Sequence, residues 1–407
     1  SDNVTLPGGD SRYPVNPPTT GSANRRQSHG TSVSGIIVAQ HNGQDAVGIA
    51  PQSQWIPNAG SNTNFSLETR RLADIINNSW GSSGSRGIRV PTPTDLQRWE
   101  NSWSVTVDHP AISQLVNSAG NGRRRRGNLL WQNTNNRMYN NHREVISVGA
   151  TTQAGNVETY STPGPGVLIS APVSTATAAG GRTLTSDVTD DTASSTDNRG
   201  YADGNTTALF AGTSSAAPMV SGTIALMLEV NPSLTRRDIQ HILVQTAQKN
   251  RLTDSDLDGE LDGVIPGGTT ELRNSFIANA NTDALNAPDP YNTGWFQNGA
   301  GHWVSDSFGF GIVDAGEAVN LAGNWTNVSD ELKATTNTIL SNPYTIPEGN
   351  LGGLNSLSDA GSWNVNDTLK VEWVELTLDL NLPEQDEVML AVQSPSGTRS
   401  VLMAPGG

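Results

Sequence analysis

Short apolar runs alternate with helical patterns over the first three quarters of the chain. Val145-Ile146-Ser147-Val148 and Gly166-Val167-Leu168-Ile169 are typical of strands buried on both faces. Thr235-Arg236-Arg237-Asp238 is a capping-box pattern, and it predicts a helix whose apolar face includes Ile239, Ile242 and Leu243. Such alternation favours an α/β fold in which helices cover both faces of a parallel sheet.

Two further helical patterns each follow a short segment of small and polar residues. The first segment is Ser28-His29-Gly30-Thr31-Ser32, and the apolar positions after it are Val33, Ile36, Ile37 and Ala39. The second segment is Gly212-Thr213-Ser214-Ser215-Ala216-Ala217-Pro218, and the apolar positions after it are Met219, Val220, Ile224, Leu228 and Val230. We therefore expect His29 and Ser214 each to lie at the N-terminus of a helix.

The pattern changes after about Asn324. Apolar residues alternate from Leu369 to Trp373, slip by one position, and alternate again from Val374 to Leu380, as a strand with a β-bulge would do. A further strand is expected over Val388, Leu390 and Val392, before a turn at Ser394-Pro395-Ser396-Gly397. These features predict an antiparallel β-sandwich in this part of the chain.

Composition narrows the class of protein. The 407 residues are enough for two domains, and 34% hydrophobic residues with 42 Gly and 22 Pro indicate a loop-rich globular protein. The apolar stretch from Ile224 to Leu228 ends at Glu229, so no membrane span is expected. A net charge of −15 argues against a nucleic-acid partner and makes bound cations plausible, and the lack of Cys excludes disulfides.

Ser214 and His29 are the residues that carry candidate chemistry. A Ser hydroxyl becomes a nucleophile when a His base lies within hydrogen-bonding reach, and the N–H groups at a helix start suit a developing oxyanion. Gly212, Ala216 and Ala217 are small, so a substrate backbone could approach closely. Ser214 could instead serve only as a helix cap and His29 as a core residue. The two segments together favour a serine peptidase.

These motifs resemble those of the subtilisin-like serine proteases (subtilases), and within them the kexin-like branch. Asn117-Ser118-Ala119-Gly120-Asn121-Gly122 resembles the loop that carries the oxyanion-hole amide of that family, which would be Asn121. Phe308 to Ala315 is similar to the closing segment of the branch, and Gln393 to Thr398 is similar to its P domain. The resemblance implies a subtilisin-like parallel sheet flanked by helices over residues 1–323, and a partial P-domain β-sandwich over residues 330–407.

The catalytic Asp that the family requires has no clear candidate. Only Asp2 and Asp10 precede His29, and neither ends an apolar strand, so we expect the Asp to lie upstream of residue 1. The resemblance implies an exported bacterial endopeptidase, secreted or periplasmic, acting on protein or peptide substrates. A catalytically inactive subtilase-fold binding or scaffold protein is the alternative.

An acidic segment makes calcium the expected cofactor, in a structural role. Five acids in nine residues place oxygens at alternate positions around Gly259, and the candidate ligands are Asp254, Asp256, Asp258, Glu260 and Asp262. The segment is not an EF-hand, because Ile265 occupies the position of the bidentate Glu. A solvated acidic loop without a metal is the alternative.

Substrate preference is expected to depart from that of kexin-like enzymes, which use acidic residues to bind paired basic residues. At the two corresponding positions this chain has Gly84 and Arg137. Arg123-Arg124-Arg125-Arg126 follows the Asn121 loop, either as a basic rim that repels cationic substrates or as a solvated loop. We therefore expect no strong preference for Lys or Arg pairs before the cleaved bond.

Overall fold

The fold is described here from a computed structural model. It describes residues 23–43, 46–56, 73–81, 114–123, 132–137, 139–173, 183–187, 205–249, 295–334, 370–376, 390–395 and 399–403.

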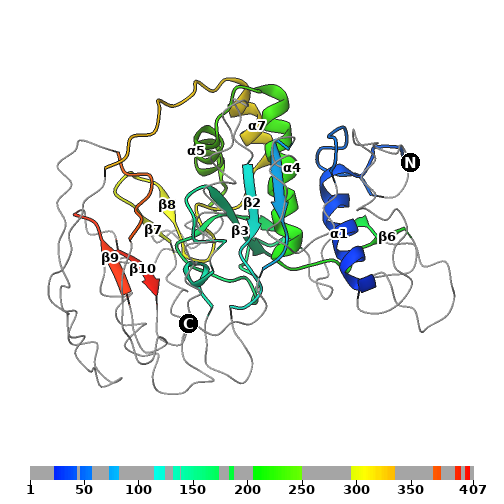
Figure 1. The fold of residues 1–407 in the computed structure, drawn as a ribbon, viewed down its shortest axis with the longest axis horizontal. Coiled ribbons are helices and arrows are strands. Elements are labelled where there is room, and N and C mark those ends of the chain that lie inside the picture. The colour runs from blue at the N-terminus through cyan, green and yellow to red at the C-terminus, as the bar shows by residue number, and fades with distance from the viewer. Residues whose placement is uncertain are drawn as a thin grey trace, which may run out of the picture.

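Four parallel strands form the central sheet in the order β1-β2-β3-β4 (Figure 1). They are β1 (Ile75–Asn78), β2 (Gln114–Ser118), β3 (Val145–Thr151) and β4 (Val167–Pro172). Every residue of β2 and β3 is buried, which explains why the apolar run from Val145 is nearly continuous. The predicted strands at 145 and 167 are confirmed, as is the α/β class.

Helix α4 (Thr213–Val230) packs against all four strands and fills the centre of the core. Its residues Val220, Ile224 and Met227 are fully buried in one cluster with Val116 and Ile146 of the sheet. This cluster fixes the helix firmly, because each such side chain contributes about 1.5–3 kcal/mol on burial. The N-terminus of α4 therefore has a set position relative to the sheet.

Helix α1 (Ala23–Val38) packs against α4 and against the short strand β5 (Thr185–Ser186), which pairs with β6 (Thr206–Thr207). Gly35 permits the contact with β5, because a Cβ there would lie 2.5 Å from Oγ1 of Thr185. The helix begins at Ala23, so the prediction that His29 lies at a helix N-terminus is wrong. Residues 23–28 contain one apolar residue and gave no helical pattern to detect.

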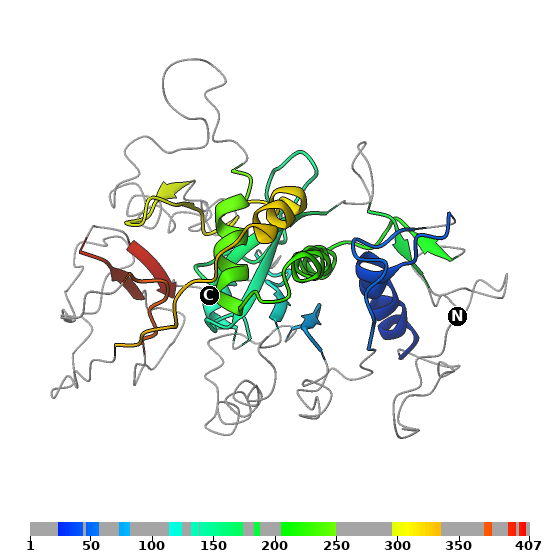
Figure 2. The same cartoon turned by 90° about the horizontal axis from the view of Figure 1, so that it is seen from above.

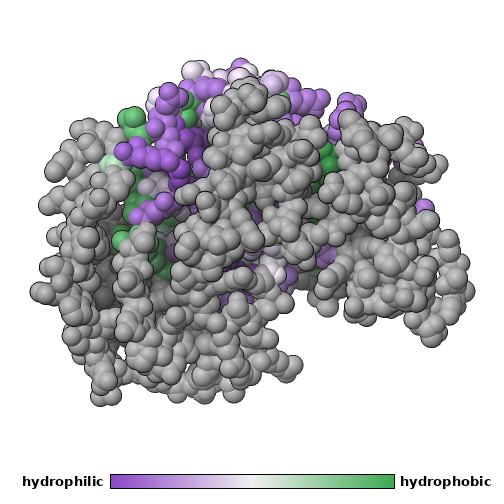
Figure 3. All heavy atoms as spheres, viewed as in Figure 1, coloured by the Kyte–Doolittle hydropathy of each residue, from purple (hydrophilic) through white to green (hydrophobic). Residues whose placement is uncertain are grey.

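Helices α5 (Arg236–Thr246) and α7 (Ala315–Gly323) complete the described helical layer. The predicted capping box at the start of α5 is confirmed, since the Thr235 side chain accepts from the Asp238 N–H and the Asp238 side chain accepts from the Thr235 N–H. The strap that follows α7 (residues 324–334) is hydrophilic and exposed for most of its length, in the upper left region of Figure 3. None of the described helices is long and apolar enough to cross a membrane.

The remaining described elements are small. The 3-10 turn η1 (Thr134–Asn136) precedes β3, and β7 (Phe296–Gln297) pairs with β8 (Trp303–Val304). Strands β9 (Leu390–Gln393) and β10 (Arg399–Met403) form an antiparallel pair around the predicted turn. Figures 1 and 2 place this pair and α1 at opposite ends of the molecule.

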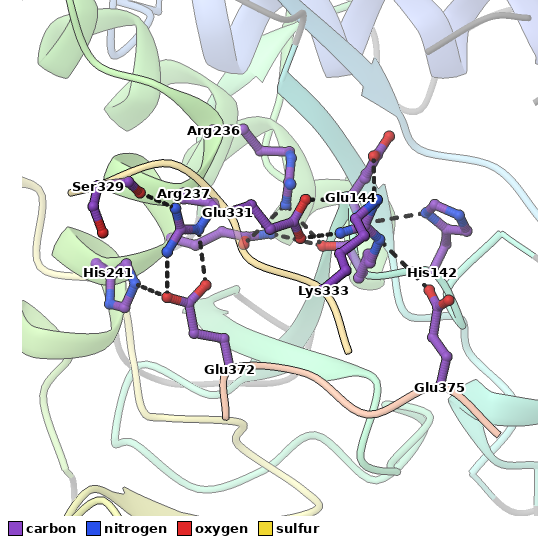
Figure 4. A network of polar contacts seen from close by, with 12 residues as sticks. His142, Glu144, Arg236, Arg237, His241, Ser329, Glu331, Lys333, Glu372 and Glu375 are labelled. Atoms are coloured by element: carbon purple, nitrogen blue, oxygen red, sulfur yellow. Dashed lines mark hydrogen bonds and ion pairs between the residues drawn. The ribbon is translucent and has the colours of Figure 1, made fainter. Parts of the chain in front are cut away.

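The strand predicted from Leu369 is not formed over the described residues 370–376. Val371 and Val374 are exposed there, so burial of apolar side chains against another surface does not stabilise a strand. Glu372 and Glu375 of this segment instead form ion pairs with Arg237 and Arg143, in a network that also includes Glu331 (Figure 4). Ion pairing, not strand pairing, connects these residues to α5 and to the loop before β3.

Candidate active site

Ser214 is the second residue of α4 and is half-buried. The helix is capped by Gly212, whose φ of 90° is a left-handed conformation that favours glycine. A Cβ on Gly212 would also lie 2.9 Å from Nδ2 of Asn121. Glycine at this position thus allows the loop that carries Asn121 to approach the start of the helix.

Two hydrogen bonds connect Ser214 to Ser79, which follows β1. The Ser214 hydroxyl donates to the Ser79 carbonyl at 3.1 Å, and the Ser79 hydroxyl donates to the Ser214 carbonyl at 2.9 Å. The Ser214 carbonyl is available because its partner in a regular helix would be the N–H of residue 218, which is Pro218. Ser79 thereby replaces a missing helical bond at the candidate nucleophile.

Ser79 is itself held by a polar chain that returns to α4. Asn77 of β1 donates from Nδ2 to the Ser79 hydroxyl at 3.0 Å, and Ser221 of α4 donates to Oδ1 of Asn77 at 2.9 Å. Hydrogen bonds therefore join the end of β1 to α4 at two positions along the helix, Ser214 and Ser221. Sequence analysis did not assign Asn77, Ser79 or Ser221 a role, because their partners lie more than 130 positions away along the chain.

Asn121 contacts the first residue of α4. Its Oδ1 accepts from the Thr213 N–H at 2.9 Å and from the Thr213 hydroxyl at 2.8 Å. Because a backbone N–H can only donate, this contact fixes which end of the amide faces the helix. Within the described residues no acceptor takes a hydrogen bond from Nδ2, so this donor is available close to Gly212, two residues before Ser214. The Ser214 N–H is a second donor, since the second residue of a helix has no carbonyl four positions earlier within it.

Tyr160 supports the same helix start from the other side. The Gly212 N–H donates to the Tyr160 hydroxyl at 3.1 Å. Burial raises the pKa of Tyr160, with a further contribution from nearby Glu158, so the phenol stays neutral over the working pH range. The chain bend before Ser214 is thus fixed by a neutral hydrogen bond.

His29 lies on α1, which packs against α4. Its ring meets the ring of Phe210 edge-on, with centroids 5.2 Å apart and planes at 83°. Burial lowers the pKa of His29, which favours the neutral form that a general base needs. The ring makes no hydrogen bond to Ser214 in the described part of the protein, where the hydroxyl faces Ser79. The structure brings Asn121 to the start of α4 and leaves His29 on the neighbouring helix.

Arg123 and Arg137 differ in burial and in the residues that they contact. Arg123 is buried and donates to the Ser307 hydroxyl at 2.8 Å, so it is a structural residue and not part of a basic rim. Residues 124–126 lie outside the described residues. Arg137, which follows η1, is half-buried and directs its guanidinium toward Gly81 and Gly120, the residues that follow the ends of β1 and β2.

The predicted calcium ligands Asp254, Asp256, Asp258, Glu260 and Asp262 all lie outside the described residues. Among those that are described, no group of three or more His, Asp or Glu side chains could hold a metal ion. The donor chemistry of the acidic segment suits calcium, which prefers carboxylate oxygens.

Comparisons with known proteins identify the family of this chain. A family model described as "Subtilase family" matches residues 9–311. Furin-1 of Xenopus laevis is 30% identical over 387 residues, covering 93% of this chain and 42% of furin-1, and human furin is 28% identical over 386 residues. The chain spans less than half the length of these curated relatives.

Solved structures extend the comparison to the fold. The crystal structure of the serine protease of Aeromonas sobria in complex with its chaperone is similar with a TM-score of 0.65. Sequence identity is 22%, and the match covers 93% of this chain and 66% of the protease. A second structure of the same protease gives a TM-score of 0.62. At this level of identity the likeness concerns the fold.

Proposed function

The chain belongs to the subtilase family, with furin-like convertases among its relatives, and from this premise we propose that it is a serine endopeptidase. Ser214 is the nucleophile, His29 the general base, and Asn121 an oxyanion donor together with the Ser214 N–H. The observation that carries the proposal is the orientation of Asn121. Thr213 holds its Oδ1, and its free Nδ2 lies close to Gly212 at the N-terminus of α4, which supports a role for it as an oxyanion donor.

The proposed reaction proceeds through an acyl-enzyme intermediate. The Ser214 hydroxyl rotates away from the Ser79 carbonyl and attacks the scissile carbonyl carbon while His29 takes its proton. The carbonyl oxygen becomes negative and is held by Asn121 and the Ser214 N–H. The C–N bond then breaks as His29 gives the proton to the leaving amine, and water hydrolyses the ester by the same route.

A serine-reactive fluorophosphonate tests the nucleophile. We expect it to label the protein once, and we expect Ser214→Ala to abolish labelling and hydrolysis without changing the melting temperature. Ser215→Ala is the matched control, because the Ser215 hydroxyl is buried without a hydrogen-bond partner in the described residues and its loss should leave labelling intact. Labelling that persists in Ser214→Ala would place the nucleophile elsewhere, and no labelling of the parent protein would favour an inactive scaffold.

The same proposal includes four further features, of which the calcium site comes from the acidic segment and the others come from the family resemblance. The protein is an exported bacterial enzyme, secreted or periplasmic. Its substrates are proteins or peptides, and it binds structural calcium through the acidic segment from Asp254 to Asp262. The peptidase domain covers residues 1–323, and a P domain covers residues 330–407. The antiparallel pair of β9 and β10 supports the last of these assignments.

A further inference from the structure

Arg137 lies at the edge of the sheet where β1 and β2 end. A Cβ on Gly120 would lie 2.5 Å from Cζ of Arg137, and a Cβ on Gly81 would lie 3.0 Å from its Nη1. The guanidinium therefore lies directly against the backbone of two glycines, one in each of the loops that follow β1 and β2. Any larger residue at position 120 would displace it.

The charge of Arg137 has no carboxylate partner in the described part of the chain. Its guanidinium donates to the neutral side chain of Gln132. Arg143 and Arg237, by contrast, are paired with Glu331 and Glu372. Burial lowers the pKa of Arg137, so its charged form is less stable there than in water. A half-buried cation of this kind is stabilised when an anion joins it.

The guanidinium is also close to the candidate chemistry. Gly120 immediately precedes Asn121, whose Nδ2 would hold the oxygen of the scissile carbonyl. The substrate residue that supplies this carbonyl carries its side chain on the adjacent Cα, so that side chain points into the immediate neighbourhood of Asn121. Gly120 and Gly81 have no side chains that could come between this neighbourhood and Arg137.

We propose that Arg137 makes the enzyme select an acidic residue, Glu or Asp, at the position that supplies the scissile carbonyl. The guanidinium fork would bind the substrate carboxylate through two parallel N–H···O bonds. This inference rests on the proposed peptidase function, and it replaces the basic preference expected of kexin-like enzymes with a preference for the opposite charge.

The test uses four peptides that differ only in the residue before the cleaved bond, which is Glu, Gln, Leu or Arg. For the parent enzyme we expect kcat/KM for the Glu peptide to exceed that for the Gln peptide by about tenfold or more, the size of a charge-assisted hydrogen bond. Arg137→Gln should bring this ratio close to one, and Arg137→Lys should give an intermediate ratio because it keeps the charge and loses the fork. Arg137→Glu should reverse the preference toward the Arg peptide.

Arg143→Gln is the matched control, since Arg143 is similarly half-buried but pairs with Glu331, and it should keep the parent ratio. A Glu to Gln ratio near one in the parent enzyme would overturn the inference and leave the peptidase function intact. A high ratio that survives Arg137→Gln would assign selection to another residue and also overturn it. If the enzyme cleaves none of the peptides and the fluorophosphonate does not label it, the proposed function is overturned, and this inference with it.

Discussion

Asn121 has an observed structural contact and a proposed catalytic role at the start of α4, and the two can be separated chemically. Its Oδ1 satisfies the first free N–H of the helix, which is a structural role, and its Nδ2 faces away from that contact. An Asp side chain has the same shape and can still accept from Thr213, but it has no amide donor. Position 121 can therefore lose its proposed catalytic role while it keeps its structural one.

We predict that Asn121→Asp and Asn121→Ala both lower kcat by about 10²–10³, the loss known for removing an oxyanion-hole donor in subtilisin. KM should change little in either variant. Only Asn121→Ala should also lower the melting temperature, because it alone leaves the Thr213 N–H unsatisfied. Steady-state kinetics and thermal unfolding measure the two effects. A kcat loss below about threefold in both variants would mean that Nδ2 does not face the oxyanion.

At the level of single residues, the sequence indicated which side chains are candidates for catalysis, but it did not indicate which residues they contact. Ser214 and Asn121 were proposed from local motifs; Ser214 is the second residue of α4, and Asn121 contacts the first residue of that helix. The Ser79 contact was missed, since a Ser after a strand carries no sign of a partner in α4. Pro218 could have indicated this contact. A Pro inside a helix has no N–H, so the carbonyl four positions earlier, which is that of Ser214, needs another donor.

Helix α5 is the element through which the helical part contacts residues 370–376. Arg237 donates to both carboxylate oxygens of Glu372, at 2.6 and 2.9 Å, and His241 lies 3.0 Å from the same carboxylate (Figure 4). Glu375 lies on the same segment, 3.7 Å from Arg143, and is more exposed. The contact of Arg237 is therefore the stronger of the two.

We predict a pH-dependent contribution of Glu372 to stability. The hydrogen bond from Arg237 outweighs desolvation and, with His241, lowers the pKa of Glu372 to about 2. The folded state thus binds this proton less readily than the unfolded state, whose ordinary pKa is 4.5. The stabilisation is present above pH 4.5 and is lost as the pH falls from 4.5 toward 2.

Denaturant unfolding at pH 7, 5 and 3 measures this contribution. Glu372→Gln should lower the free energy of unfolding at pH 7 by about 0.5–1 kcal/mol, the range of partly exposed ion pairs, and the difference should shrink at pH 3. Glu375→Gln is the control and should have a smaller effect at every pH. Equal losses for both variants, or a loss from Glu372→Gln that grows in acid, would contradict the prediction.

The elements show where sequence patterns suffice and where they do not. The capping box at Thr235 was predicted correctly, because the pattern and its partner lie within one turn. The start of α1 was missed, since packing against α4 and β5 supports a helix beyond its apolar pattern. Alternation from Leu369 predicted a strand that residues 370–376 do not form, since a strand also requires a neighbouring strand, which no local pattern specifies.

For the molecule as a whole, the net charge of −15 makes cation binding the expected source of additional stability. Calcium that binds only the folded state raises the melting temperature by mass action, so a chelator should lower it and added calcium should restore it. A double variant, Asp256→Asn with Asp258→Asn, should lose most of this response. An unfolding midpoint that chelation leaves unchanged would mean that the segment from Asp254 to Asp262 is acidic surface only.

The hydrogen bonds of Asp238 bear on how the protein can be divided. This buried carboxylate accepts from the indole N–H of Trp325 at 2.8 Å and from the Val328 N–H at 2.7 Å, both beyond the end of α7. Burial alone would raise the pKa of Asp238, but these bonds and those from Thr235 lower it. A protein cut at Gly323 would leave that charge short of two donors. A cut between the two proposed domains should therefore be made after Val328, so that residues 324–328 stay with the proposed peptidase domain, which the sequence pattern ends at residue 323.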